Sequence, residues 1–290
     1  MVGIVGLIMI FVVIFGGFVL GGGNLDIILE AMPTEGSMIV GAGIATIIIG
    51  NDVSAIKHTA KDIAKLFKGS HWKKSDYRDL LTLLFELIRL AAQNPMALEE
   101  HIETPQNSTI FSKFPRILGD AEATNLISDT LRAGLMNYND PNQVEEVLDK
   151  RVEHDLQHAL HGSHALQALA DGLPAIGIVV AVLGIVKTMG SIDQPPEILG
   201  KLIGSALVGT FLGVLLAYGL VAPTAVRVQG AVQEDHSFYQ LIREVLIANL
   251  HHHPATICIE VGRQNIPRQL RPSFTEVESA LKEVKQGAET

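Results

Sequence analysis

Apolar residues along the chain gather in four segments, which form two pairs separated by a long and more polar stretch. Residues 2–20 carry no charged side chain, and they are about as numerous as a helix needs to cross roughly 30 Å of hydrocarbon. Residues 202–222 are uncharged in the same way. These two segments predict the first and the fourth of four transmembrane helices.

The inner two segments are less clear as spans. Residues 38–50 are few enough to form a buried helix of a soluble protein instead. A helix that begins near Pro33 would reach spanning length, with Glu35 close to its outer end, where a carboxylate can reach the interface. Residues 172–186 extend backward to Ala165 as an apolar pattern. They predict the third span.

The first segment has an alternative interpretation as a cleavable signal peptide. No basic residues precede its apolar run, and it contains no small-residue cleavage site. Gly21, Gly22 and Gly23 followed by Asn24 are instead typical of a helix that ends. A permanent span is therefore favoured.

Basic residues are distributed unevenly among the loops. The short loops at 21–32 and 190–200 contain no Lys or Arg, whereas residues 57–78 contain seven. Those seven are Lys57, Lys61, Lys65, Lys68, Lys73, Lys74 and Arg78. Positively charged segments stay in the cytoplasm, so we expect both short loops outside and both termini inside. The expected location is the bacterial inner membrane.

The stretch between the two pairs predicts a helical cytoplasmic domain. Apolar residues recur there at helical spacing in two sets, which are Leu80, Leu83, Leu84, Leu87, Leu90 and Ala91, and Val144, Val147, Leu148, Val152 and Leu156. Pro105, Pro115 and Pro141 punctuate the stretch. We therefore predict an all-α chain in four parts: a first helix pair at 1–50, a helical domain at 51–168, a second pair at 169–223, and a cytoplasmic helix and tail at 224–290.

Composition agrees with a membrane protein. Apolar residues make up 48% of the chain, aromatic residues only 5%, and the mean hydropathy is +0.30. The single cysteine, Cys258, excludes an internal disulfide framework. The net charge of −9 gives no support to nucleic-acid binding.

Candidate chemistry within the spans is sparse. We expect no ionisable side chain at mid-depth, and only hydroxyls such as Thr46, Ser205, Thr210 and Tyr218. An ion path through hydrocarbon normally carries an ionisable group. Either another chain supplies that group, or these helices only anchor the cytoplasmic domain.

Glycine and proline spacing adds two expectations about the second helix pair. Gly200 with Gly204, and Gly209 with Gly213, form small-residue pairs that let another helix approach closely. Pro174 and Pro223 either simply punctuate their helices or act as hinges.

Three histidines on one helical face, His154, His158 and His161, raise the possibility of a metal site. No cysteine or second ligand pair converges on them in sequence, so a polar helix surface is favoured and no metal or other cofactor is expected. Any role for this histidine face stays open.

Several separated motifs resemble the MotA/PomA family of flagellar stator subunits, which is related to the ExbB and TolQ proteins. They are FGGFVLGGG at 15–23, GAGIATIIIGND at 41–52, IFSKFPRILGDAE at 110–122, DGLPAIGIVVAVLGIVKTMGS at 171–191, LVGTFLGVLLAYGLVAPTA at 207–225 and RPSFTEVE at 271–278. The resemblance implies a non-enzymatic motor subunit. In this family five copies surround two copies of a MotB-like single-span partner, which carries the ion-binding Asp, and ion flow through the complex turns the flagellar rotor.

The resemblance also implies roles for individual residues. Pro174 and Pro223 match prolines tied to torque generation, and Thr210 matches a threonine that lines the ion path. Ala181 stands where sodium-driven members tend to carry Thr, which favours H⁺ over Na⁺ as the transported ion.

A rotor contact is implied as well. Glu99 matches a glutamate that meets the rotor protein FliG, while the matching arginine position falls near Ala92. Arg89 lies three residues earlier and could substitute for that arginine. The acidic excess of residues 79–168 could face such a partner or simply water.

Two other functions stay open at this level. An ExbB- or TolQ-type energy-transducing complex also surrounds partner helices with five subunits, but those proteins usually have three spans. A purely structural membrane scaffold would need no ion path at all.

Overall fold

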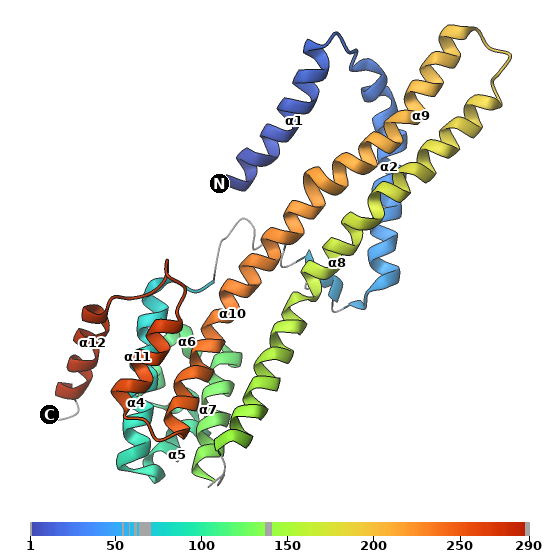
Figure 1. Cartoon of the computed structure of the whole chain (residues 1–290). Helices are drawn as coiled ribbons and strands as arrows, with labels where there is room; N and C mark the ends of the chain where they lie inside the picture. The colour runs from blue at the N-terminus through green and yellow to red at the C-terminus, as the bar shows by residue number, and fades with distance from the viewer. Residues whose placement is uncertain are drawn as a thin grey trace. The chain divides into compact units, whose positions relative to one another are not determined.

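The computed structural model describes residues 2–53, 55–57, 59, 60, 63, 71–136 and 141–287, and all regular structure within these ranges is helical (Figure 1). The α-helices are α1 (Val2–Leu20), α2 (Asp26–Gly50), α4 (Lys74–Gln93), α5 (Pro95–Glu103), α6 (Pro115–Leu118), α7 (Ala121–Leu135), α8 (Pro141–Met189), α9 (Pro196–Leu216), α10 (Ala222–Leu250), α11 (Ala255–Asn265) and α12 (Phe274–Gly287). Two short 3₁₀ turns, η1 (Pro105–Asn107) and η2 (Phe111–Lys113), and a π-helical turn, η3 (Ala217–Val221), complete them. The all-α prediction is confirmed. Lys61, Lys65 and Lys68 of the predicted basic stretch lie outside the described residues.

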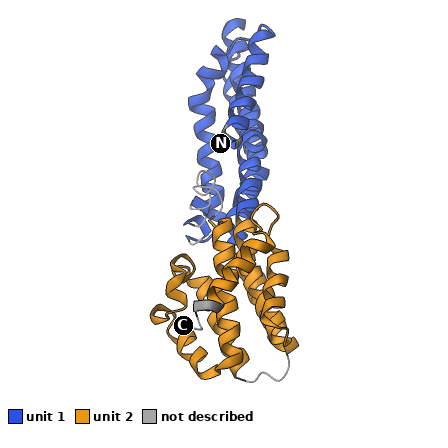
Figure 2. Ribbon diagram, turned by 90° about the vertical axis from the view of Figure 1, so that its left-hand side faces the viewer, with its two compact units in different colours: residues 1–69, 159–231 blue, residues 70–158, 232–290 orange. Residues whose placement is uncertain are grey.

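The chain divides into two compact units, each built from two separate stretches of sequence (Figure 2). Unit 1 contains residues 1–69 and 159–231, and unit 2 contains residues 70–158 and 232–290. The long helices α8 and α10 therefore contribute residues to both units.

Unit 1 is built from long apolar helices with a narrow core. Helix α2 packs along α9, and the buried side chains at its centre are Ala31, Ile39, Leu173, Val180, Val208, Leu212 and Ala217. Many large apolar side chains point outward instead, such as Val13, Val179 and Leu207, each more than half exposed. A soluble protein rarely exposes so much apolar surface, so lipid or other apolar helices must cover this unit.

Length and hydropathy identify the membrane helices. Three helices are long and apolar enough to cross a membrane, namely Asp26–Gly50, Pro141–Met189 and the continuous run Pro196–Leu250. The described apolar part of α1, Val5–Leu20, is shorter. Helix α1 as a whole has the predicted bounds, Val2–Leu20, and carries no charged residue.

Helix α2 begins seven residues earlier than the sequence suggested, which corrects the prediction of a start near Pro33. The Asn24 side chain accepts a hydrogen bond from the Asp26 N–H at 2.8 Å, and Asp26 lies in the first turn, where a negative charge is favourable. Pro33 consequently lies inside the helix. The hydrogen bond from Asp26 to Asn24, and not the proline, accompanies the helix start.

Pro223 does not end its helix, because α9, η3 and α10 follow one another without a break. A proline ring clashes with the carbonyl four residues before it, which here belongs to Gly219. Gly219 lies in the π-helical turn Ala217–Val221, where the hydrogen-bonding pattern is widened. This turn lets the helix continue past the proline. The helix predicted at the start of residues 224–290 is confirmed as part of α10.

Unit 2 has a conventional hydrophobic core centred on α4. Leu80, Leu83, Leu84 and Leu87 have no exposed surface, which confirms the predicted apolar face of this helix. Trp72 stacks on Phe238 of α10 with ring centroids 3.8 Å apart. Pro105, Pro115 and Pro141 each occupy the first residue of a helix, where their missing N–H costs nothing.

The second predicted apolar set is only partly buried. Val144, Leu148 and Val152 are each 5% exposed, but Val147 is 64% exposed, which corrects its assignment to the core. Spacing by four residues keeps the first three on one stripe of α8, and Val147 lies to one side of that stripe.

Candidate functional site

Glycines bring α8 and α9 unusually close together within unit 1. A Cβ placed on Gly213 would lie 2.8 Å from both Gly177 Cα and the Leu173 carbonyl oxygen, and one on Gly177 would lie 2.9 Å from the Gly209 carbonyl oxygen. Any side chain at these positions would collide with backbone. The predicted close packing is confirmed for Gly209 and Gly213, whereas a Cβ added to Gly200 would meet no other part of the structure within 4 Å.

Gly177 is the residue of this crossing that sequence reasoning missed. It lies four residues before Ala181 and three after Pro174 on α8, so it belongs to the same segment as two predicted site residues. A glycine in an apolar helix is common, and only the pairing with α9 reveals its role.

Ala181 and Thr210 lie at this crossing on opposite helices. Ala181 is 6% exposed, and its backbone nitrogen lies 3.2 Å from where a Cβ on Gly209 would stand. Thr210 follows Gly209 directly on α9 and is half-buried. The two residues are therefore on neighbouring turns of two packed helices, and their proposed role in an ion path stays a prediction.

Glu35 is a buried carboxyl within the same group of helices. It is 6% exposed, and its Oε2 is buried without a hydrogen-bond partner among the described residues. A Cβ on Gly209 would lie 3.0 Å from this oxygen. Helix α2 begins at Asp26, so Glu35 lies more than two turns inside the helix and not near its start, as the sequence suggested. The expectation that the spans carry no ionisable group at mid-depth stays a prediction.

The two site prolines differ in their surroundings. Pro174 is half-buried inside the continuous helix α8, between Leu173 and Gly177, which both meet α9 at the glycine crossing. Pro223 is exposed, two residues after the end of the π-helical turn. Both lie within helices, as hinge residues would, and whether they act as hinges stays a prediction.

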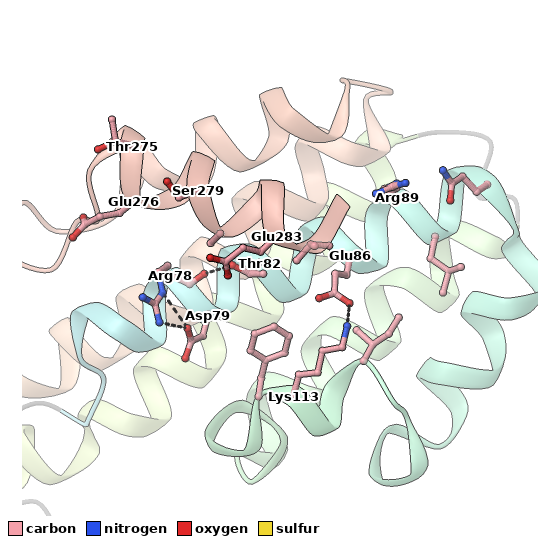
Figure 3. Close-up of a pocket in the computed structure, with 16 residues that line it drawn as sticks. Arg78, Asp79, Thr82, Glu86, Arg89, Lys113, Thr275, Glu276, Ser279 and Glu283 are labelled. Atoms are coloured by element: carbon pink, nitrogen blue, oxygen red, sulfur yellow. Dashed lines mark hydrogen bonds and ion pairs between the residues drawn. The ribbon is translucent and has the colours of Figure 1, made fainter. Parts of the chain in front are cut away.

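The predicted rotor-contact residues lie in unit 2 and differ in accessibility. Glu99 is exposed on the short helix α5. Arg89, on α4, lines a cavity of about 900 Å³ beside α12, and its Nη1 is buried without a hydrogen-bond partner among the described residues (Figure 3). The same cavity holds the Lys113 to Glu86 ion pair, whose Nζ and Oε2 atoms are 2.7 Å apart. The two predicted rotor-contact residues therefore differ: Glu99 is exposed, whereas Arg89 is partly buried.

Unit 2 also contains a buried histidine that sequence reasoning did not single out. His236 is 4% exposed, and its Nε2 has no hydrogen-bond partner among the described residues. Burial lowers the pKa of this imidazole because the charged form loses its hydration, while the carboxylates of Asp155 and Glu153 act in the opposite direction. His236 is therefore kept neutral inside the unit.

The histidine face predicted as a possible metal site shows no ligand cluster. Within the described ranges, no three or more His, Cys, Asp or Glu side chains gather closely enough to hold a metal ion. His154 is exposed, with its Nδ1 3.8 Å from Asp155 Oδ1.

Family models match most of the chain. The model "Motility protein A N-terminal" matches residues 4–95, and the model "MotA/TolQ/ExbB proton channel family" matches residues 122–240. Motility protein A of Escherichia coli is 38% identical over 97% of this chain and 95% of that protein. Chemotaxis protein LafT of Vibrio parahaemolyticus is 32% identical over 96% of this chain and 97% of that protein.

Solved structures share the fold. The MotAB structure from C. jejuni aligns with a TM-score of 0.70 at 18% identity, covering 93% of this chain and 98% of that chain. The flagellar MotAB stator complex from Bacillus subtilis aligns with a TM-score of 0.65 at 19% identity, covering 96% and 98%.

The apolar helices, their exposed apolar surface and the glycine crossing define a multi-pass helical protein of the inner membrane. Two family models and relatives that match nearly end to end make the assignment specific. The chain belongs to the motility protein A family, within the MotA/TolQ/ExbB proton channel proteins. Its function is that of a flagellar stator subunit.

Proposed function

We propose that this chain conducts protons together with a MotB-like single-span partner and converts the proton flow into torque on the flagellar rotor. The observation that carries the proposal is the 38% identity to a motility protein A across 97% of the chain. The motility-specific family model at residues 4–95 favours this function over an ExbB- or TolQ-type complex.

Four spans with both termini in the cytoplasm make up the proposed topology. It is supported by the basic stretch after α2, which favours the cytoplasm, and by the loops at 21–25 and 190–195, which lack Lys and Arg. Helix α1 would then be the first span, although it is the shortest of the apolar helices.

Five copies of the chain around two copies of the partner form the proposed assembly. The partner helix would bring an ion-binding Asp to the face of α8 and α9 near Thr210 and Ala181. The alanine at 181 favours protons, because a proton needs fewer oxygen ligands than Na⁺. Pro174 and Pro223 would transmit packing changes along α8 and α10.

Contact with the rotor protein FliG is proposed through charged residues of unit 2. Glu99 is exposed and available to a partner. Arg89 would have to leave its cavity beside α12 to reach the same partner. We therefore expect charge reversal at Glu99 to reduce torque more than charge reversal at Arg89 does.

Complementation tests the central proposal. Cells that lack their own stator should swim when they produce this chain with its partner, and should stop when a protonophore collapses the proton gradient. Swimming that persists on a sodium gradient alone would refute the proton assignment. Failure to restore swimming with a correctly inserted complex would refute the stator function.

A further inference from the structure

Glu35 is the one acidic side chain of the described residues that lies buried at depth in the apolar helices of unit 1. Its neighbours Ala31 and Ile39 are 2% and 0% exposed, so the carboxyl belongs to the buried stripe of α2. Acidic residues are almost never fully buried without a partner. This one therefore requires a physical explanation.

The depth of Glu35 follows from the helix bounds. It lies nine residues after Asp26, which corresponds to about 13 Å along a helix that rises 1.5 Å per residue. Ala181, close to it on α8, lies eight residues before Met189, or about 12 Å by the same rise. Both values are measured along the helices from their ends at the 21–25 and 190–195 loops, and they place Glu35 more than two turns inside α2.

The carboxyl occupies a niche formed by a missing side chain. Oε2 is buried and has no hydrogen-bond partner among the described residues. It fits beside α9 because Gly209 has no Cβ, which would otherwise lie 3.0 Å from it. The same Cβ would lie 3.1 Å from Val180 Cγ1 and 3.2 Å from the Ala181 nitrogen. The niche therefore lies at the α8 and α9 crossing, directly beside Thr210 in the chain.

Charged groups around the niche are few. Lys187, on α8 and exposed, is the cation whose field acts on the carboxylate. Gly209, on the facing side of α9, offers only backbone. An ionised carboxylate without a donor costs several kcal/mol in apolar surroundings, so such a group takes up a proton readily and releases it only to a nearby acceptor.

We propose that Glu35 is a proton-binding carboxyl in the ion path of this chain, and this rests on the proposed function. A proton leaves a hydronium ion on the outer side as the O–H bond forms at Glu35. That O–H bond then breaks as the proton passes to the partner's carboxylate or to water between them. Glu35 returns to its ionised form, so the transfer is balanced and needs no other reactant.

Proton influx in stator-less cells tests the proposal. The cells produce the chain with its partner, and a cytoplasmic pH-sensitive fluorophore records influx after an acid shift. Glu35→Gln is expected to reduce influx by about 100-fold or more, because a positioned proton-transfer group contributes about 10²–10⁴-fold. Glu35→Asp should retain part of it. Glu30→Gln is the matched control, because Glu30 is an exposed glutamate on the same helix.

Two further measurements distinguish a proton-binding role of Glu35 from a purely structural one. The Glu35→Gln protein must insert in normal amount and co-purify with its partner, and loss of either would assign Glu35 to packing and overturn the proposal. Dicyclohexylcarbodiimide, which reacts with protonated carboxyls in apolar surroundings, should label Glu35 but not Glu30 in wild-type membranes, as located by mass spectrometry. Absence of that label would also overturn it.

The outcomes distinguish this inference from the stator function on which it rests. If the wild type conducts protons and Glu35→Gln conducts equally well, the inference fails while the function stands. If Glu35 is labelled but the wild type conducts no protons, the proton-binding carboxyl stands and the proposed function fails.

Discussion

Gly213→Ala should disturb the crossing of α8 and α9, because the added methyl group has no room. Its Cβ would lie 2.8 Å from Gly177 Cα and 2.8 Å from the Leu173 carbonyl oxygen, both of which are backbone atoms. Carbon atoms in contact normally lie about 3.5–4.0 Å apart, so the two helices would have to separate by about 0.7–1.2 Å.

The expected energetic cost is about 1–3 kcal/mol, the range found for overpacking in a tightly packed interior. A Gly to Ala change inside a helix also gains about 1 kcal/mol of helix propensity, which opposes this cost. Gly200→Ala on the same helix provides the control for that gain, because a Cβ there has no atom within 4 Å. The difference between the two variants isolates the crossing.

Thermal stability of the detergent-purified complex measures that difference, with the intact complex followed by size-exclusion chromatography. Gly213→Ala should lower the midpoint relative to both wild type and Gly200→Ala, and cells carrying it should swim more slowly. Equal midpoints and equal swimming for the two variants would refute the conclusion that α8 and α9 depend on backbone contact at this position.

Three other predictions concern unit 2 and the topology. Trp72→Ala removes a buried ring that stacks on Phe238, and should destabilise unit 2 by about 3–5 kcal/mol, seen as faster hydrogen exchange in α4, whereas Ala at the exposed Met96 should change little. His236 has a lowered pKa in the folded state, so the unfolded state binds more protons, and stability should be complete above about pH 6.5 and fall as the pH drops below it. His236→Phe should flatten that slope in hydrogen exchange of residues 232–250, and an unchanged slope would contradict the assignment. For the topology, the only native cysteine, Cys258, is fully buried, so Asp193→Cys should react with an impermeant maleimide in intact cells and Met96→Cys only after permeabilisation. The reverse pattern would invert the proposed orientation.

Features that depend on one helix alone could be predicted from the sequence. The bounds of α1 follow from a charge-free apolar run, and the buried face of α4 follows from leucines at helical spacing. Both signals are local, since each helix carries its own pattern. Residues 15–23 and 171–191 likewise carry enough family-specific sequence to indicate the function.

Features that depend on pairing between helices could not be predicted in this way. Pro33 and Pro223 were predicted as helix boundaries, yet both lie inside continuous helices. Helix α2 begins at Asp26, well before Pro33, and a π-helical turn accommodates Pro223. The role of Gly177 in helix packing depends on the position of α9, which the sequence of α8 does not reveal. Glu35 was expected near the start of its helix because the sequence pattern did not reveal that α2 begins at Asp26.

The glycine crossing and the buried carboxyl are physically coupled, because Gly209 serves both. Its missing Cβ lets the Ala181 backbone approach and leaves space for Glu35 Oε2. Ionising a carboxyl in such surroundings costs several kcal/mol, which exceeds the roughly 1–3 kcal/mol expected for overpacking the crossing. A change in the protonation of Glu35 is therefore large enough to alter how α2 packs on α9. Because such coupling is reciprocal, proton uptake at the proposed site shifts the packing of α2 on α9, and a helix movement that changes this packing shifts the proton affinity of Glu35 by the same free energy.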